Sequence, residues 1–132
     1  AEKNEARNAE YEAEKQARKD AEEAAAAAAK AAADAQNAAY AAAQTEFQDA
    51  TEAHEKAKED LKTARERAEK QRNFETRGLP KASQRKAKQN LANAEKAVVE
   101  AVTAEAEAQQ RLDAAKEALA KLHNAEEEGG GA

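Results

Sequence analysis

The stretch Arg77-Gly78-Leu79-Pro80 decides the fold of this chain, because no other glycine or proline occurs before Gly129. A glycine readily takes the left-handed conformation that commonly ends a helix, and a proline suits the first turn of the helix that follows. The sequence on both sides is rich in Ala, Glu, Lys, Arg and Gln, which are strong helix formers. We therefore predict two long helices joined by a tight turn at residues 77–81.

The composition excludes an ordinary globular core. Among 132 residues there are two Tyr, two Phe and no Trp, Cys or Met, and alanine dominates the apolar fraction of 41%. A buried alanine contributes well under the roughly 1.5–3 kcal/mol of a buried Leu or Phe. The charged fraction of 37% would also suit a disordered chain. The strong helix formers and the regular placement of the apolar residues favour an all-α fold instead.

The segment after the turn carries a clear seam of a and d positions, the two apolar positions of a coiled-coil heptad. Larger residues fall mainly at one of these positions and alanine at the other, which lets two antiparallel helices approach closely. Glu105 is the single break in the seam. Its members are Leu91, Ala94, Val98, Ala101, Glu105, Ala108, Leu112, Ala115, Leu119 and Leu122.

The first helix, expected from Ala6 to about Thr76, fits two registers. Small apolar residues recur about every eleven positions along it, which is typical of a nearly straight or slightly right-handed supercoil. Its second half also fits heptads, and the sequence leaves both registers open. The heptad positions are Tyr40, Ala43, Phe47, Ala50, His54, Ala57, Leu61, Ala64 and Ala68.

A turn centred between Gly78 and Leu79 sets the register of the two helices, because residue numbers of facing pairs then add to about 157. Phe47 should lie near Gln110 and Leu112. The larger residues of the two helices would thus meet each other, which supports a hairpin independently of the glycine and proline.

The two helices differ in length, so the hairpin should have unequal arms. We expect an unpaired alanine-rich helical extension over residues 1–32, an antiparallel hairpin over 33–125, and a flexible linker or tail over 126–132. A fold-back near Gln36 and Asn37, giving three helices, is the competing layout. The extension could pair with a protein partner or with a second copy of the chain, making a homo-oligomer.

Nothing in the sequence indicates catalysis, a metal site or a cofactor. His54 and His123 are the only histidines, and no carboxylate or histidine lies near them at metal-ligand spacing. There is no glycine-rich phosphate loop and no cysteine, and Ser83 is the only serine. The longest apolar runs are also too short to cross a bilayer. We therefore expect a protein that is not an enzyme and has no transmembrane segment.

The turn region is strongly basic, unlike the rest of the chain. Residues 65–88, called the basic tip below, hold nine basic and three acidic residues, a net charge of +6. The whole chain carries −5, so the remainder carries −11. Two large apolar residues, Phe74 and Leu79, lie in the basic tip, where little of the chain is left to cover them. An exposed aromatic residue among arginines is typical of a binding hot spot. The predicted partner-binding residues are Arg72, Phe74, Arg77, Leu79, Lys81 and Arg85.

Two other interpretations of the basic tip remain open. Phe74 and Leu79 could simply close the turn while the lysines keep it soluble. The cations could instead meet phospholipid headgroups or nucleic acid. The net charge of −5 and the scarcity of aromatic residues at the tip make nucleic acid the weaker of these choices, so we expect none as a partner.

Two stretches of the chain resemble a known protein family. They are Lys70-Gln-Arg-Asn-Phe-Glu-Thr-Arg-Gly-Leu-Pro-Lys-Ala-Ser-Gln84 and Asn90-Leu-Ala-Asn-Ala-Glu-Lys-Ala97. A long alanine-rich hairpin with a short basic tip resembles the coiled-coil hairpins of enterobacterial colicins, in style over residues 3–125. In those bacteriocins such hairpins form receptor-binding or translocation domains that engage an outer-membrane receptor or channel. The resemblance implies a secreted or extracellular bacterial protein-binding module. The chain also resembles coiled-coil surface proteins of Gram-positive cocci, which implies a structural spacer or adhesin segment that self-associates.

Overall fold

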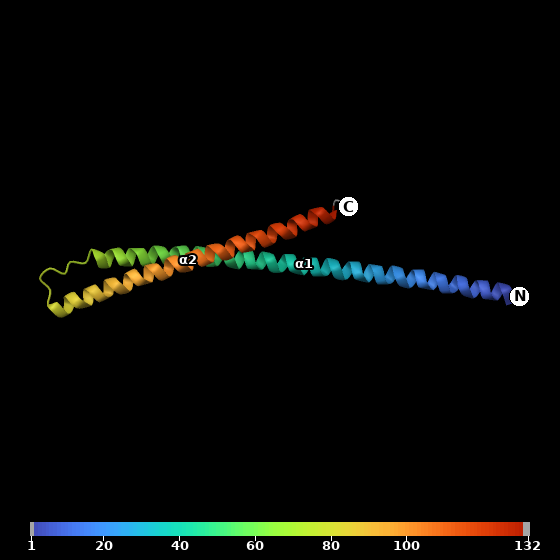
Figure 1. The fold of residues 1–132 in the computed structure, drawn as a ribbon, viewed down its shortest axis with the longest axis horizontal. Coiled ribbons are helices and arrows are strands. Elements are labelled where there is room, and N and C mark those ends of the chain that lie inside the picture. Colours follow the sequence, from blue (N-terminus) through green and yellow to red (C-terminus); the bar gives the residue numbers. More distant parts are fainter. Residues whose placement is uncertain (1, 131–132) are drawn as a thin grey trace. The chain divides into compact units, whose positions relative to one another are not determined.

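The fold consists of two long helices. The computed structural model describes the backbone of residues 2–130 and the side chains of residues 2–125, with helices α1 (Glu2–Arg72) and α2 (Lys81–Gly130). No strand occurs in this described part of the chain. α2 packs antiparallel against the second part of α1 (Figure 1). The predicted all-α fold and helical hairpin are confirmed.

The end of α1 differs from the sequence-based expectation. The last α-helical bond runs from the amide of Asn73 to the carbonyl of Glu69, at 2.9 Å, so the helix ends at Arg72 and not near Thr76. Asn and Thr are weak helix formers, and Glu75, the next heptad position after Gln71, is charged and exposed. Residues 73–80, called the connector below, therefore join the helices, and the turn predicted at 77–81 is only the second half of that connection.

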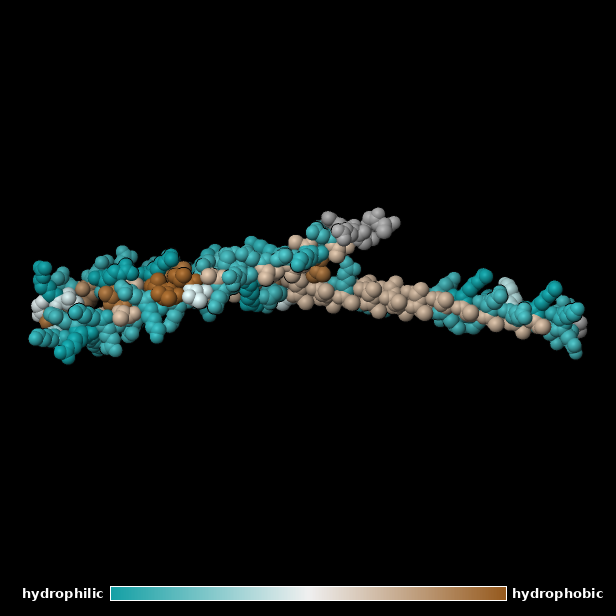
Figure 2. Space-filling view, viewed as in Figure 1, coloured by the Kyte–Doolittle hydropathy of each residue, from teal (hydrophilic) through white to brown (hydrophobic). Residues whose placement is uncertain are grey.

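The chain forms two compact units, an N-terminal unit (Ala1–Ala41) and a hairpin unit (Ala42–Ala132). Every described side chain of the N-terminal unit is exposed, and the first half-buried one in the chain is Ala43. The division thus lies later than the predicted boundary between residues 32 and 33. In Figure 2 the alanine-rich part of α1 forms a continuous pale-brown surface.

The competing three-helix layout is wrong. α1 continues through Gln36 and Asn37 without a break. Neither residue removes a backbone hydrogen bond or requires a special backbone angle, and the alanines on both sides favour the helix. A polar pair alone is therefore too weak a signal for a fold-back.

The predicted α2 seam is shielded from solvent throughout. All ten of its positions, from Leu91 to Leu122, are buried or half-buried. On α1 the buried residues are Ala50, His54, Ala57, Leu61 and Ala68, which follow heptad spacing. In the hairpin unit the structure therefore selects the heptad register that the sequence left open.

Large and small residues alternate in the seam as predicted. Leu112, only 7% exposed, packs in one cluster with Ala50 and Ala115, and Phe47 covers that cluster from the side. Ala50 is fully buried. The small side chain of Ala50 leaves room for the isobutyl group of Leu112, so the two backbones can approach closely without a cavity.

An ion pair across the helices confirms the predicted register. The Arg111 guanidinium donates hydrogen bonds from Nε to Glu46 Oε1 at 2.6 Å and from Nη2 to Glu46 Oε2 at 3.1 Å. Their residue numbers add to 157, the value expected from the position of the turn. The hydrogen bond from Arg111, followed by its charge, lowers the pKa of the Glu46 carboxyl below its ordinary value.

The two polar breaks in the seams meet each other. His54, 8% exposed, lies with its Nε2 atom 3.0 Å from Oε1 of Glu105 on the opposite helix. Residue numbers 54 and 105 add to 159, so the pair follows the same register. Each side chain supplies the hydrogen-bond partner that the other would lack in an apolar seam.

The C-terminal end of α2 also differs from the expectation of a flexible tail. The backbone is helical to Gly130, although we expected a linker over 126–132. Three consecutive glutamates, Glu126 to Glu128, favour continued helix before the glycines. Residues 131 and 132 lie outside the described residues.

Candidate protein-binding site at the hairpin tip

The connector is built around a tight turn at residues 76–79. The amide of Leu79 donates a hydrogen bond to the carbonyl of Thr76, at 3.2 Å. Gly78, at the third position of the turn, has a φ of 84°, the left-handed value that a type II turn requires there. A Cβ atom at Gly78 would meet nothing within 4 Å, so the backbone angle alone is what favours glycine.

The side chain of Gln84 ties this turn to α2. Its Nε2 amide donates to the carbonyl of Leu79 at 3.0 Å and to that of Thr76 at 3.4 Å. Its own backbone amide donates to the carbonyl of Pro80 at 3.0 Å, which places Gln84 in the first turn of α2. One side chain thereby donates hydrogen bonds to two backbone carbonyls of the connector, and these bonds stabilise its conformation.

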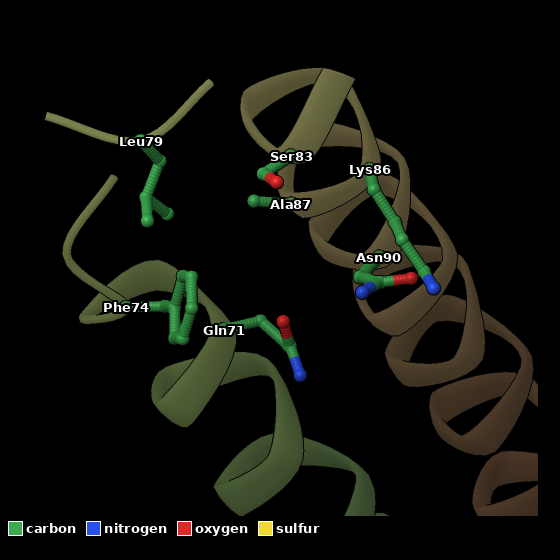
Figure 3. A pocket seen from close by; sticks show the side chains of 7 residues that line it. All are labelled: Gln71, Phe74, Leu79, Ser83, Lys86, Ala87 and Asn90. Atoms are coloured by element: carbon green, nitrogen blue, oxygen red, sulfur yellow. The ribbon is translucent and has the colours of Figure 1, made fainter. Parts of the chain in front are cut away.

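A groove opens beside the connector, between the last turn of α1 and the first turns of α2. Its volume is about 360 Å³, and Figure 3 shows its lining side chains. Phe74 and Leu79 form one wall, and residues from α2 form the other. We call it the tip groove; its lining residues are Gln71, Phe74, Leu79, Ser83, Lys86, Ala87 and Asn90.

The tip groove exists because the seam ends here. In the register of the hairpin, Gln71 is the α1 residue that faces Ala87, and both are half-buried. The Gln71 amide favours water over an apolar seam, so it does not seal this end of the hairpin as Leu112 seals the seam farther along. α1 then ends at Arg72, so no further turn of helix covers the α2 face beyond Ala87.

The structure brings two of the six predicted binding residues together in this groove. Phe74 is 55% exposed and Leu79 is half-buried, and both line the tip groove. Arg72 has a structural contact instead, with its Nε atom 3.7 Å from Oε1 of Glu95 on α2. Both groups of that pair are more than half exposed, so it stabilises the hairpin only weakly.

The other three predicted residues are exposed cations. Lys81 and Arg85 border a second, shallow hollow of about 230 Å³, together with Gln84 and Lys88. Arg77 is exposed in the connector and lines neither hollow. Lys86 is the cation at the edge of the tip groove. The basic tip thus combines exposed cations with one half-covered apolar patch.

Sequence reasoning missed several residues of this site. The hydrogen bonds of Gln84 had no sequence signal, because a glutamine in a first helical turn usually faces solvent. The position of Gln71 could have been found, since it continues the α1 heptad three residues after Ala68. Ser83, Lys86, Ala87 and Asn90 follow helical spacing and thus share one face of α2.

The tip groove combines apolar, amide and cationic side chains. Within the described residues, no three His, Cys, Asp or Glu side chains lie close enough to hold a metal ion. None of the described helices is both long and apolar enough to cross a membrane. Comparisons with protein-family models, with curated proteins and with solved structures found no match to this chain.

Proposed function

We propose that this chain is a non-catalytic protein-binding module, which docks its basic tip on an acidic surface of a protein partner. The observation that carries the proposal is the position of Phe74. This large aromatic side chain is 55% exposed at the end of the molecule where the positive charge is concentrated. Cations around an apolar patch steer the encounter, and the patch itself supplies buried contact after docking.

The resemblance to colicin hairpins gives the first partner to test, an outer-membrane receptor or channel. A secreted or extracellular bacterial protein with this shape would reach such a partner from outside the cell. The Gln84 hydrogen bonds brace the connector, which reduces the conformational entropy that it would lose on binding. We favour a protein partner over a lipid surface because the exposed Phe74 ring lines a groove that one side chain of a protein could enter.

The test is a pull-down from outer-membrane extracts, followed by association and dissociation rates with the captured protein. Replacing Arg77 and Lys81 by Glu should slow association and reduce its salt dependence, since exposed charges act mainly on encounter. Phe74→Ala should speed dissociation by about tenfold, the equivalent of about 1.4 kcal/mol. All three side chains are exposed, so helicity should not change.

The matched control reverses two lysines in the body of the hairpin, Lys56→Glu and Lys96→Glu. Both are exposed and have no ion-pair partner in the described residues. This variant changes net charge as much as the tip variant and should bind like the parent. Equal slowing in both variants would mean that only net charge matters. Capture by anionic phospholipid vesicles, lost in the tip variant, would replace the protein partner by a membrane surface.

The exposed N-terminal unit favours a second candidate function, a structural spacer or adhesin segment that self-associates. All its described side chains are exposed, including Tyr11 at 63%. Sedimentation equilibrium of the full chain and of a chain lacking residues 1–32 distinguishes the two candidates. A dimer that becomes a monomer on deletion supports the spacer, whereas a monomer in both cases contradicts it.

A further inference from the structure

The tip groove has two chemically different walls. The connector side presents the ring of Phe74 and the isobutyl group of Leu79 (Figure 3). The α2 side presents the methyl group of Ala87 between polar neighbours. The apolar part of the groove, between Phe74, Leu79 and Ala87, is filled best by an apolar side chain. The volume of 360 Å³ lies within the usual range of about 300–1,000 Å³ for small ligand sites.

Polar groups at the edge of the groove are free to bond a partner. The side chains of Gln71, Ser83 and Asn90 make no hydrogen bond within the described residues. Figure 3 shows the amides of Gln71 and Asn90 on opposite walls. A primary amide has both donors and an acceptor, which is the combination that a peptide group needs. An acyl chain or a phosphate would use only part of it.

The charge around the groove selects the neighbours of the bound side chain. Lys86 lies at the groove edge and has no ion-pair partner in the part of the chain that is described. The surrounding basic tip has a net charge of +6. A carboxylate beside the inserted side chain would therefore be attracted, whereas a lysine or arginine there would be repelled.

We propose that the tip groove receives one aromatic or large aliphatic side chain from an acidic peptide segment of the partner protein. The inserted side chain packs between Phe74 and Ala87, the amides of Gln71 and Asn90 bond the peptide backbone, and Lys86 meets a neighbouring carboxylate. This inference rests on the proposed function and specifies what the basic tip recognises.

Two fluorescein-labelled peptides test it on the full chain by fluorescence anisotropy. One is Asp-Glu-Phe-Glu-Asp, and the other has Ala in place of Phe, so both carry the same charge. The Phe peptide should bind about tenfold more tightly, as expected for partial burial of one aromatic side chain. Ala87→Leu should remove this preference, because the larger side chain occupies the groove.

Ala82→Leu is the matched control, since Ala82 is exposed on the same helix and does not line the groove. It should leave the tenfold preference unchanged. If Ala87→Leu lowers helicity, Phe74→Ala replaces it, because an exposed side chain can be truncated without loss of fold. Loss of the preference in this variant supports the inference, and retention contradicts it.

The outcomes separate this inference from the function on which it rests. Equal binding of both peptides, weakened by Arg77→Glu with Lys81→Glu, overturns the groove and leaves docking on an acidic surface intact. Absence of binding by either peptide also overturns the groove inference. The pull-down and the charge-reversal rates described above decide the proposed function by themselves.

Discussion

The N-terminal unit and the hairpin unit share the helix α1 and show two different ways of keeping it helical. The part of α1 in the N-terminal unit has no Val, Ile, Leu or Phe, and its side chains are all exposed. The part in the hairpin unit buries Leu61 and four smaller residues against α2. Alanine propensity thus gives a helix in both units, whereas a packed interface needs larger side chains at heptad positions.

Hydrogen exchange should show the largest difference between the two units. Amides of residues 8–37 open by local unfolding of an unsupported helix, whereas those of residues 50–68 open only when the hairpin separates. We expect exchange to be at least about 100-fold faster in the first group, equivalent to about 2.8 kcal/mol. Exchange measured by mass spectrometry or NMR checks this. Equal protection would mean that the N-terminal unit is covered in solution.

Replacing an alanine by a larger side chain should destabilise the hairpin unit and not the N-terminal unit. Ala50 is fully buried against Leu112, so Ala50→Leu overpacks the seam and should lower the free energy of unfolding by about 1–3 kcal/mol. Ala28→Leu, in the exposed unit, should change it by less than about 0.5 kcal/mol. Urea unfolding followed by circular dichroism measures both. A large loss from Ala28→Leu would contradict the exposed state of that unit.

The His54–Glu105 contact provides a smaller and more specific test of the hairpin unit. His54→Leu leaves the half-buried Glu105 carboxyl without its partner and should cost about 1–2 kcal/mol. Replacing both residues by leucine should recover most of that loss, because two apolar side chains can then pack in the seam. Additive losses in this double-mutant comparison would show that the two side chains do not interact.

The Glu46–Arg111 ion pair should give the smallest effect, and one that depends on pH. The lowered pKa of Glu46 means that the pair stabilises the folded state above the ordinary carboxyl pKa of 4.5. This contribution is lost as pH falls through the lower pKa of the folded state. Glu46→Gln should therefore lower Tm slightly at pH 7 and not at pH 2. An equal shift at both pH values would exclude the charge of Glu46 as the cause.

The hairpin and its register could be predicted from the sequence because both depend on strong signals, a glycine and proline at the turn and a repeating apolar pattern in the helices. Gly78 and Pro80 located the reversal, and the α2 stripe identified the face that packs against α1. The position of the turn then fixed which residues face each other, as Glu46 and Arg111 show. The helix end at Arg72 was missed because Asn73 and Thr76 weaken a helix only slightly, without the clear signal of glycine or proline.

The site was harder to predict because it depends on single contacts. Phe74 and Leu79 were chosen for their apolar character in a basic segment, and they do lie together. Arg72 was chosen for charge alone, yet it faces Glu95. The Gln84 hydrogen bonds follow from the path of the connector, which propensities do not determine. Glu105 was interpreted as an isolated break and His54 as an ordinary heptad position, although their register places them opposite each other.

The hydrogen bonds of the connector do not depend on the length of the two helices. The turn at residues 76–79 and its Gln84 bonds are made within one short continuous stretch of sequence. Below it, the two helices repeat every seven residues in a constant register. Removing one heptad from each helix, opposite one another, would shorten the shaft by about 10 Å and keep the seam in phase. The length of the shaft and the conformation of the connector are therefore encoded separately, and the connector should keep its hydrogen bonds on a shaft of another length.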